Sequence, residues 1–76
     1  MSIVHKLRIP DDLVWLIRKM HPQLKRKVRS ALDEIVRNFD SGKMLKQELS
    51  GLRSYRVGRM RIIYRLASHQ IIELVA

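Results

Sequence analysis

The segment from Leu52 to Leu66 constrains the fold of this chain more than any other, because two strand-like runs flank the pair Gly58-Arg59. A two-residue loop with glycine in the first position is typical of a tight β-hairpin. Such a turn sets the register, which decides the face of the sheet that each side chain occupies. The expected pairs on the mostly apolar face are Val57 with Met60, Tyr55 with Ile62 and Arg53 with Tyr64. The expected pairs on the other face are Arg56 with Arg61, Ser54 with Ile63 and Leu52 with Arg65.

The pairing of Arg56 with Arg61 is the informative one. Directly opposed residues have Cβ atoms about 4.5–5.5 Å apart, and like charges at that distance destabilise a sheet. An anion held between the two guanidinium groups would offset the repulsion, and phosphate oxygens suit the arginine fork. Two side chains that splay into water would also tolerate one another, because salt screens exposed charges. A phosphate site and a solvated pair therefore both stay open.

Basic residues are concentrated in this same segment. The chain has a net charge of +9, and residues 52–65 hold five arginines and no acidic residue. Such a patch indicates a polyanionic partner: nucleic acid, an acidic membrane or an acidic protein. We favour nucleic acid. Aromatic residues make up only 5% of the chain, which argues against a stacking platform for single strands.

Length and cysteine content limit the classes of protein further. Seventy-six residues allow one domain, which we expect to span residues 1–76. Without cysteine the chain can form no disulfide, thiolate nucleophile or cysteine-ligated zinc site. The N-terminal segment is no signal peptide, and no run approaches transmembrane length. We therefore expect a cytoplasmic protein with no membrane contact.

Two helices are predicted before the hairpin. Pro10-Asp11-Asp12 is typical of a helix start, since proline is tolerated at the first helical position and acids complement the helix dipole. His21-Pro22 ends this helix near Met20 and starts the second, because the residue before proline avoids helical geometry. We expect Trp15 to be a packing anchor. The apolar stripe of the first helix comprises Leu13, Leu16, Ile17 and Met20.

The second helix has a strong 3.6-residue apolar period that continues to Phe39. Asp40-Ser41-Gly42 stops it, with Gly42 as a left-handed cap. Its stripe comprises Leu24, Val28, Ala31, Leu32, Ile35 and Phe39. Basic residues crowd the exposed side of its first half: Lys25, Arg26, Lys27 and Arg29. They form either a solvated face or a second phosphate-contacting ridge beside the hairpin.

Strand-like segments complete the expected fold. Ser2 to Ile9 alternates and predicts a strand with one buried side, on which His5 is simply packed. Residues 43–50 form a polar connection with room for a helical turn. After a turn at Ala67–Gln70, a largely buried strand covers Ile71–Ala76. The chain thus predicts an α+β fold in the order β-α-α-β-β-β, in which the last three strands form an antiparallel meander and the helix pair covers one face of the sheet.

Few catalytic constellations are available. The acids are scattered, and the three histidines lie on different elements without metal-ligand spacing, so we expect no metal and no cofactor. The arginine cluster with Tyr55 and Tyr64 is still suited to RNA cleavage, because cations stabilise charge on the phosphorane. A general acid or base near neutral pH is harder to find.

A longer motif combines these features. It is Gly42-Lys43-x-Leu45-Lys46-x-Glu48-Leu49-x-Gly51-Leu52-Arg53-Ser54-Tyr55-Arg56-Val57-Gly58, followed by Arg61-Ile62-Ile63-Tyr64-Arg65. With His21-Pro22 before a basic helix, this pattern resembles the RelE/ParE toxin superfamily over nearly the whole chain. The resemblance implies a single RelE-like domain that is the toxin of a type II toxin–antitoxin module. In the RelE branch it implies a metal-independent endoribonuclease that enters the ribosome, cleaves mRNA and inhibits translation.

The resemblance also implies roles for individual residues. Arg56 resembles the cation that follows the strand tyrosine, and Arg61 the cation on the next strand that contacts the scissile phosphate; both are the expected catalytic residues. Gly58 stands where some members carry a lysine, so that role is unfilled or falls to Arg59. The residues expected to bind RNA or phosphate are Arg53, Arg59, Arg65, Lys25, Arg26, Arg29, Lys43 and Lys46.

The C-terminal strand departs from the family pattern. Members usually continue past it into a segment with a further arginine and a tyrosine, whereas this sequence stops at Ala76. We therefore expect a shortened or attenuated toxin; a degenerate copy and a branch that works with fewer groups are the alternatives.

Three functions stay open. The first is the ribosome-dependent mRNA endoribonuclease, the second a ParE-like inhibitor that binds DNA gyrase, and the third a non-catalytic RNA-binding module. The first two imply a cognate antitoxin, acidic and RelB-like, and a toxin–antitoxin hetero-oligomer. The first also implies the ribosome and mRNA as partners.

Overall fold

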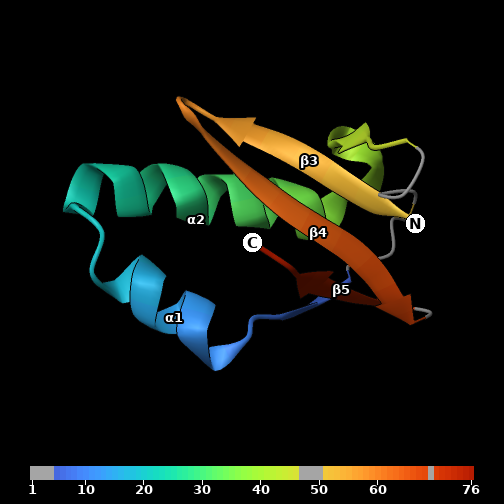
Figure 1. Cartoon of the computed structure of the whole chain (residues 1–76), viewed down its shortest axis with the longest axis horizontal. Helices are drawn as coiled ribbons and strands as arrows, with labels where there is room; N and C mark the ends of the chain where they lie inside the picture. Colours follow the sequence, from blue (N-terminus) through green and yellow to red (C-terminus); the bar gives the residue numbers. More distant parts are fainter. Residues whose placement is uncertain (1–4, 47–50, 69) are drawn as a thin grey trace.

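A computed structural model gives the fold and describes residues 5–46, 51–68 and 70–76. Figure 1 shows two helices beside one twisted sheet. The elements are β1 (Lys6–Arg8), α1 (Asp11–Arg18), α2 (Pro22–Arg37), the 3-10 helix η1 (Phe39–Ser41), β2 (Lys43–Met44), β3 (Leu52–Val57), β4 (Met60–Ser68) and β5 (Ile71–Leu74). The α+β order of strand, helix, helix and an antiparallel meander is confirmed. In the described ranges, no helix is long and apolar enough to cross a membrane.

The sheet has five strands in the order β1-β5-β4-β3-β2. β1 pairs with β5 in parallel, and the other neighbours are antiparallel. All six predicted hairpin pairs between β3 and β4 are confirmed, from Leu52 with Arg65 to Val57 with Met60. At the turn Gly58 has a φ of +60°, a left-handed conformation that glycine adopts without strain.

Three predictions about the strands and their connections need correction. The polar connection after Gly42 begins with β2, where Lys43 pairs with Ser54 and Met44 with Arg53. Residues 47–50 of that connection lie outside the described residues. β4 continues to Ser68, into the predicted turn, with an irregularity in its pairing to β5 after Leu66. The following strand is shorter than predicted and ends at Leu74.

α2 provides one wall of the core. Its buried residues follow the predicted stripe and pack against the inner face of the sheet, where Val57, Ile62 and Tyr64 are buried. The buried residues of α2 are Val28, Ala31, Leu32 and Ile35. In Figure 1 this helix runs behind β3 and β4. The predicted break between the helices is confirmed, and His21 caps α2, since its Nδ1 accepts a hydrogen bond from the Gln23 N–H at 3.2 Å.

The end of α2 differs from the prediction. The helix stops at Arg37, and Phe39 starts η1 instead of a last helical turn. The buried Tyr64 hydroxyl donates to the Phe39 carbonyl at 2.5 Å and accepts from the Gly42 N–H at 2.9 Å. Gly42 is extended, with φ −81° and ψ 153°, so the predicted left-handed cap is wrong. Glycine is needed there for space, because a Cβ would lie 2.9 Å from Tyr64 Cε1.

α1 packs far less closely. None of its eight residues is buried, although Leu13, Ile17 and the following Met20 touch the core from one side. It begins at Asp11, with Pro10 at the cap position rather than the first helical one. Trp15 is 61% exposed, so the predicted packing anchor is wrong. At 3.6 residues per turn Trp15 lies about 200° around the helix from Leu13 and from Ile17, and therefore faces away from the core.

His5 behaves as predicted. Its Nδ1 lies 3.3 Å from the Val36 carbonyl oxygen, and its ring packs against Phe39 with centroids 5.3 Å apart. β1 occupies only the last part of the predicted N-terminal strand, of which residues 1–4 lie outside the described residues.

Candidate nucleic-acid interface

The outer face of the sheet is basic. Side chains alternate along a strand, so the residues that flank the buried ones point away from α2. The exposed cations placed on this outer face are Lys6 and Arg8 of β1, Lys43 of β2, Arg56 of β3, and Arg61 and Arg65 of β4. In the described strands the acid that accompanies them is Glu73 of β5. A surface of this charge suits a polyanion.

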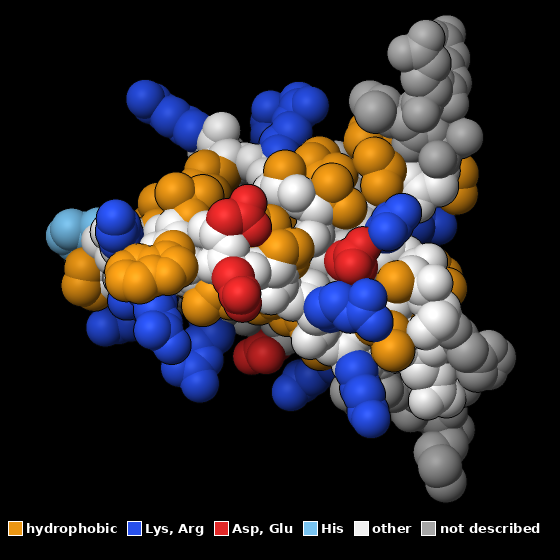
Figure 2. All heavy atoms as spheres, turned by 60° about the horizontal axis from the view of Figure 1, so that its bottom comes forward, with side chains coloured by type: hydrophobic (Ala, Val, Ile, Leu, Met, Phe, Trp, Pro, Cys, Tyr) orange, Lys and Arg blue, Asp and Glu red, His pale blue; other side chains and the backbone are white. Residues whose placement is uncertain are grey.

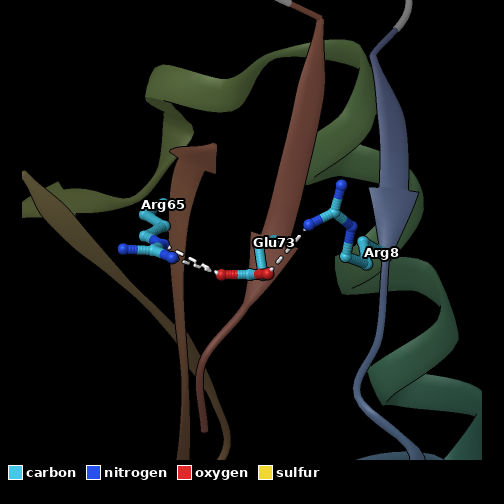
Figure 3. A network of polar contacts seen from close by, with 3 residues as sticks. All are labelled: Arg8, Arg65 and Glu73. Atoms are coloured by element: carbon cyan, nitrogen blue, oxygen red, sulfur yellow. Dashed lines mark hydrogen bonds and ion pairs between the residues drawn. The ribbon is translucent and has the colours of Figure 1, made fainter. Parts of the chain in front are cut away.

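Glu73 holds two of these arginines. Figure 3 shows its carboxylate between them, with Arg65 on β4 and Arg8 on β1. Arg65 donates to Glu73 Oε1 from Nε at 2.9 Å and from a terminal nitrogen at 2.7 Å, and Arg8 donates to Oε2 at 3.3 Å. The hydrogen bonds from Arg65 first, and then the charges of both arginines, lower the pKa of Glu73. The Arg65 guanidinium therefore already serves a contact within the fold.

Arg56 and Arg61 differ from that group. They are directly opposed across the hairpin, and both are exposed. No described acidic residue forms an ion pair with either of them. Arg59, in the turn, is exposed as well, so the closed end of the hairpin carries three arginines.

A cleft of about 570 Å³ adjoins Arg56. It lies between the N-terminal half of α2 and the end of β3. Its lining residues are Gln23, Arg26, Lys27, Ser30, Ala31, Tyr55, Arg56 and Val57. Arg26 of the basic helix face and Arg56 of the hairpin both line this cleft. No acidic side chain lines it.

Arg61 borders a different hollow. A small apolar crevice of about 40 Å³ lies between α1, the start of β4 and the C-terminal residues. Arg61 is the charged residue in its lining. The other lining residues are Leu13, Leu16, Ile17, Met20, Met60, Ile62, Leu74 and Ala76. Figure 2 views the molecule from the side of α1 and shows hydrophobic side chains at the surface with basic ones around them.

The remaining predicted binding residues are dispersed. Arg53 donates to the Gly42 carbonyl at 3.0 Å, and its guanidinium lies 5.2 Å from the Phe39 ring centroid, so it also serves the fold. Lys25 and Arg29 are exposed on α2 outside the cleft lining. Lys43 and Lys46 are exposed in and just after β2.

Tyr64 does not belong to the surface cluster predicted for it. Its side chain is 1% exposed, its hydroxyl is held by backbone groups, and burial raises its pKa. Tyr55 is the tyrosine that reaches a hollow, as part of the cleft lining. Among residues 5–46, 51–68 and 70–76, no group of His, Cys, Asp or Glu could hold a metal ion.

Sequence reasoning missed two polar lining residues of the cleft, Gln23 and Ser30. Their spacing with Arg26 follows one face of a helix and was visible in the sequence. Which strand that face meets depends on tertiary packing. Chemically, the assembled groups offer permanent positive charge, one aromatic ring and neutral hydrogen-bonding groups, a combination suited to binding a phosphodiester.

Comparisons with known proteins identify the relatives. The structure is similar to the crystal structure of the toxin–antitoxin complex RelBE2 from Mycobacterium tuberculosis, with a TM-score of 0.80 and 23% sequence identity, over 97% of this chain and 88% of that chain. A search of curated proteins finds no match. The model of the ParE toxin family, from the type II toxin–antitoxin system parDE, matches residues 8–76. Because this match covers nearly the whole chain, the chain belongs to the ParE toxin family of type II toxin–antitoxin systems, within the RelE/ParE superfamily.

Proposed function

We propose that this toxin binds RNA at the closed end of its hairpin and cleaves mRNA on the ribosome. The observation that carries the proposal is the opposed, exposed pair of Arg56 and Arg61, which no described acid neutralises. Two guanidinium groups facing one another repel in the free protein. A phosphodiester placed between them would remove that repulsion and receive charge-assisted hydrogen bonds.

The proposed chemistry is attack of a ribose 2′-hydroxyl on the adjacent phosphorus: a bond from the 2′-oxygen to phosphorus forms as the bond from phosphorus to the 5′-oxygen breaks. Solvent water takes the proton of the 2′-hydroxyl and supplies one to the departing 5′-oxygen. Negative charge develops on the phosphoryl oxygens, and Arg56 and Arg61 would stabilise it. Neither arginine can accept a proton, because a guanidinium stays protonated at all physiological pH values. We assign the in-line alignment of the 2′-oxygen to the ribosome, since correct orientation alone removes a large part of such a barrier.

A translation assay tests this proposal. A defined mRNA is translated with the toxin, and new 5′ ends are mapped by primer extension; the same reaction without ribosomes is the control. We expect cuts within the translated region only when ribosomes are present. Uncut mRNA with intact protein synthesis would refute the endoribonuclease proposal.

Inhibition of DNA gyrase is the second candidate function. It is favoured by the match to the ParE family and by the exposed Trp15 and Leu16 on α1, which suit a protein partner. A supercoiling assay with purified gyrase separates the two. Loss of supercoiling at toxin concentrations that leave mRNA intact would select this candidate.

We further propose a cognate antitoxin that is acidic and RelB-like, forms a hetero-oligomer with the toxin and acts in the cytoplasm. Two observations support it: the structural neighbour is a toxin–antitoxin complex, and the outer face offers charge complementarity to an acidic segment.

A further inference from the structure

We propose that the cleft between α2 and β3 is a nucleotide-binding subsite, in which Arg26, Lys27 and Arg56 bind a phosphate and Tyr55 stacks on the attached base. The choice of RNA as ligand rests on the proposed function, which this inference deepens by naming where the strand lies beside the arginine pair. The roles of Lys27, Gln23, Ser30 and Tyr55 are new with respect to that function.

The charges of the cleft come from two elements. Arg26 and Lys27 belong to α2, and Arg56 belongs to β3, so the packing of helix against sheet brings all three residues into the lining of one cleft. All three side chains are exposed, and none forms an ion pair with a described acid. Like charges that line one hollow repel each other, and a bound anion would reduce this repulsion. The cleft therefore selects an anion with several oxygens.

The remaining lining suits a base. Tyr55 is partly buried, and it packs against the core while also lining the cleft. An aromatic ring in such a position stacks on any base, because every base has a π-face. Gln23 and Ser30 supply neutral donors and acceptors for base edges. The cleft volume of about 570 Å³ lies within the range of about 300–1,000 Å³ that small-ligand sites occupy.

Arg56 connects the subsite to the proposed cleavage site. It lines the cleft, and it is also the direct partner of Arg61 across the hairpin. A phosphate bound in the cleft and a phosphate bound at the arginine pair would therefore share one guanidinium or be neighbours in the same strand. The subsite would then hold a nucleotide adjacent to the scissile bond, and its lining would influence which sequence is cut.

An acidic peptide would match the charge of the cleft, but the backbone beside it offers little to a peptide strand. The residues that flank a two-residue hairpin loop, here Val57 and Met60, exchange backbone hydrogen bonds with each other. Such pairs alternate along an antiparallel ladder, so Tyr55 also directs its backbone groups toward β4. On the opposite edge, β2 pairs with Arg53 and Ser54. Beside the cleft, Arg56 is then the single residue of β3 whose backbone groups could pair with a peptide. One residue is too short an edge for an added strand, because strands in sheets are usually at least three residues long.

A binding assay without ribosomes tests the subsite. The probe is a fluorescent single-stranded RNA octamer with 2′-O-methyl groups, which cannot be cleaved by attack of its own 2′-oxygen; anisotropy gives the affinity. Arg26→Gln removes one cation from the cleft, and Arg37→Gln removes one from the exposed end of the same helix, outside the cleft lining. We expect Arg26→Gln to weaken binding about tenfold, the loss expected for one charge-assisted hydrogen bond, and Arg37→Gln to weaken it less than about twofold.

Two further probes separate a nucleotide from a plain polyanion. Tyr55→Leu keeps an apolar side chain but removes stacking, so we expect about fivefold weaker binding of the RNA octamer and unchanged binding of inorganic polyphosphate. Thermal melts establish that each variant is folded. Should Tyr55→Leu fail to fold, Lys27→Gln is compared with Lys19→Gln at the end of α1, with the same expected contrast as for Arg26 and Arg37.

Three results would overturn the subsite. They are equal losses for Arg26→Gln and Arg37→Gln, equal losses of RNA and polyphosphate binding for Tyr55→Leu, and tighter binding of a poly-glutamate peptide than of RNA. Cleavage is not measured in this assay. Failure of the endoribonuclease proposal would therefore leave RNA binding in the cleft intact, and failure of the subsite would leave cleavage at the arginine pair intact.

Discussion

The two helices of this toxin form one helical hairpin but relate differently to the rest of the molecule. α2 buries a stripe of four residues against the sheet, whereas α1 buries none. The outward sides differ too, because α2 presents Arg26, Lys27 and other cations, while α1 presents Trp15 and Leu16. An amphipathic sequence therefore predicts that a helix forms, but the area of sheet available to it decides whether its apolar face is covered.

This difference makes the two helices suitable for partners of different chemistry. A basic helix beside a cleft suits a polyanion, and an exposed apolar helix suits a protein surface. The following predictions test the contrast, from the largest expected effect to the smallest.

The stability of the fold should depend on the buried residues of α2 and hardly on the exposed side chains of α1. Ile35 is fully buried, so Ile35→Ala is expected to lower the free energy of unfolding by about 2–5 kcal/mol. Leu16 is 57% exposed, so Leu16→Ala should change the free energy of unfolding by less than about 0.5 kcal/mol. Urea denaturation measures both. Similar losses for the two variants would erase the contrast between the helices.

Activity should depend on the arginine pair that lies between the two hollows. Arg61 borders the crevice beside α1 and is exposed, so Arg61→Gln should change the free energy of unfolding by less than about 0.5 kcal/mol. If the endoribonuclease proposal holds, the same change should slow mRNA cleavage about 10²–10³-fold, as for loss of one preorganised electrostatic contact. Primer extension and thermal melts measure the two effects. Arg18→Gln, at the exposed end of α1, is the matched control and should leave cleavage unchanged.

Tyr64 anchors η1, the turn that directly follows α2, and among the described residues α1 has no comparable anchor. Tyr64→Phe would leave the Gly42 N–H and the Phe39 carbonyl without this hydroxyl, at a cost of about 1–3 kcal/mol. Amide hydrogen exchange should show loss of protection concentrated at η1 and the last turn of α2. A loss of protection spread evenly over α1 and α2 would contradict the proposed anchor.

The smallest effect concerns acid stability. The pKa of Glu73 is lowered from its ordinary value of 4.5 in the folded state, so its stabilising contribution is complete above pH 4.5 and is lost as the pH falls through the lower folded value. Glu73→Gln should therefore reduce the drop in melting temperature between pH 5 and more acidic solution. Arg8→Gln, which removes one partner of Glu73, should act in the same direction, and Arg18→Gln on α1 should not. A steeper drop in Glu73→Gln would contradict the sign.

How much the sequence predicts depends on the range of the interactions involved. The hairpin register was predictable in full, because one two-residue turn fixes every pair between β3 and β4. The apolar stripe of α2 was also predictable, because its 3.6-residue period depends on the local sequence alone. The exposure of Trp15 was signalled by its angular position, about 200° from Leu13, but its size favoured the wrong prediction of a core anchor.

The parts that could not be predicted depend on distant partners. β2 is two residues long, and its pairing exists only because β3 lies beside it. Gly42 is required by the ring of Tyr64, which follows 22 residues later. The cleft joins Arg26 to Arg56, so one part of its lining was visible on the helix and the other on the strand, without a signal that the two meet.

The parallel pairing of β1 with β5 has a consequence for synthesis of the toxin. These two strands lie at opposite ends of the sequence, and the contact between Arg8 and Glu73 spans 65 residues. The entropy cost of closing a segment of that length precedes any gain from the contact, and such contacts slow folding. While the chain is being translated, the helices and the hairpin can form first, but the N-terminal strand must wait until the last strand has left the ribosome.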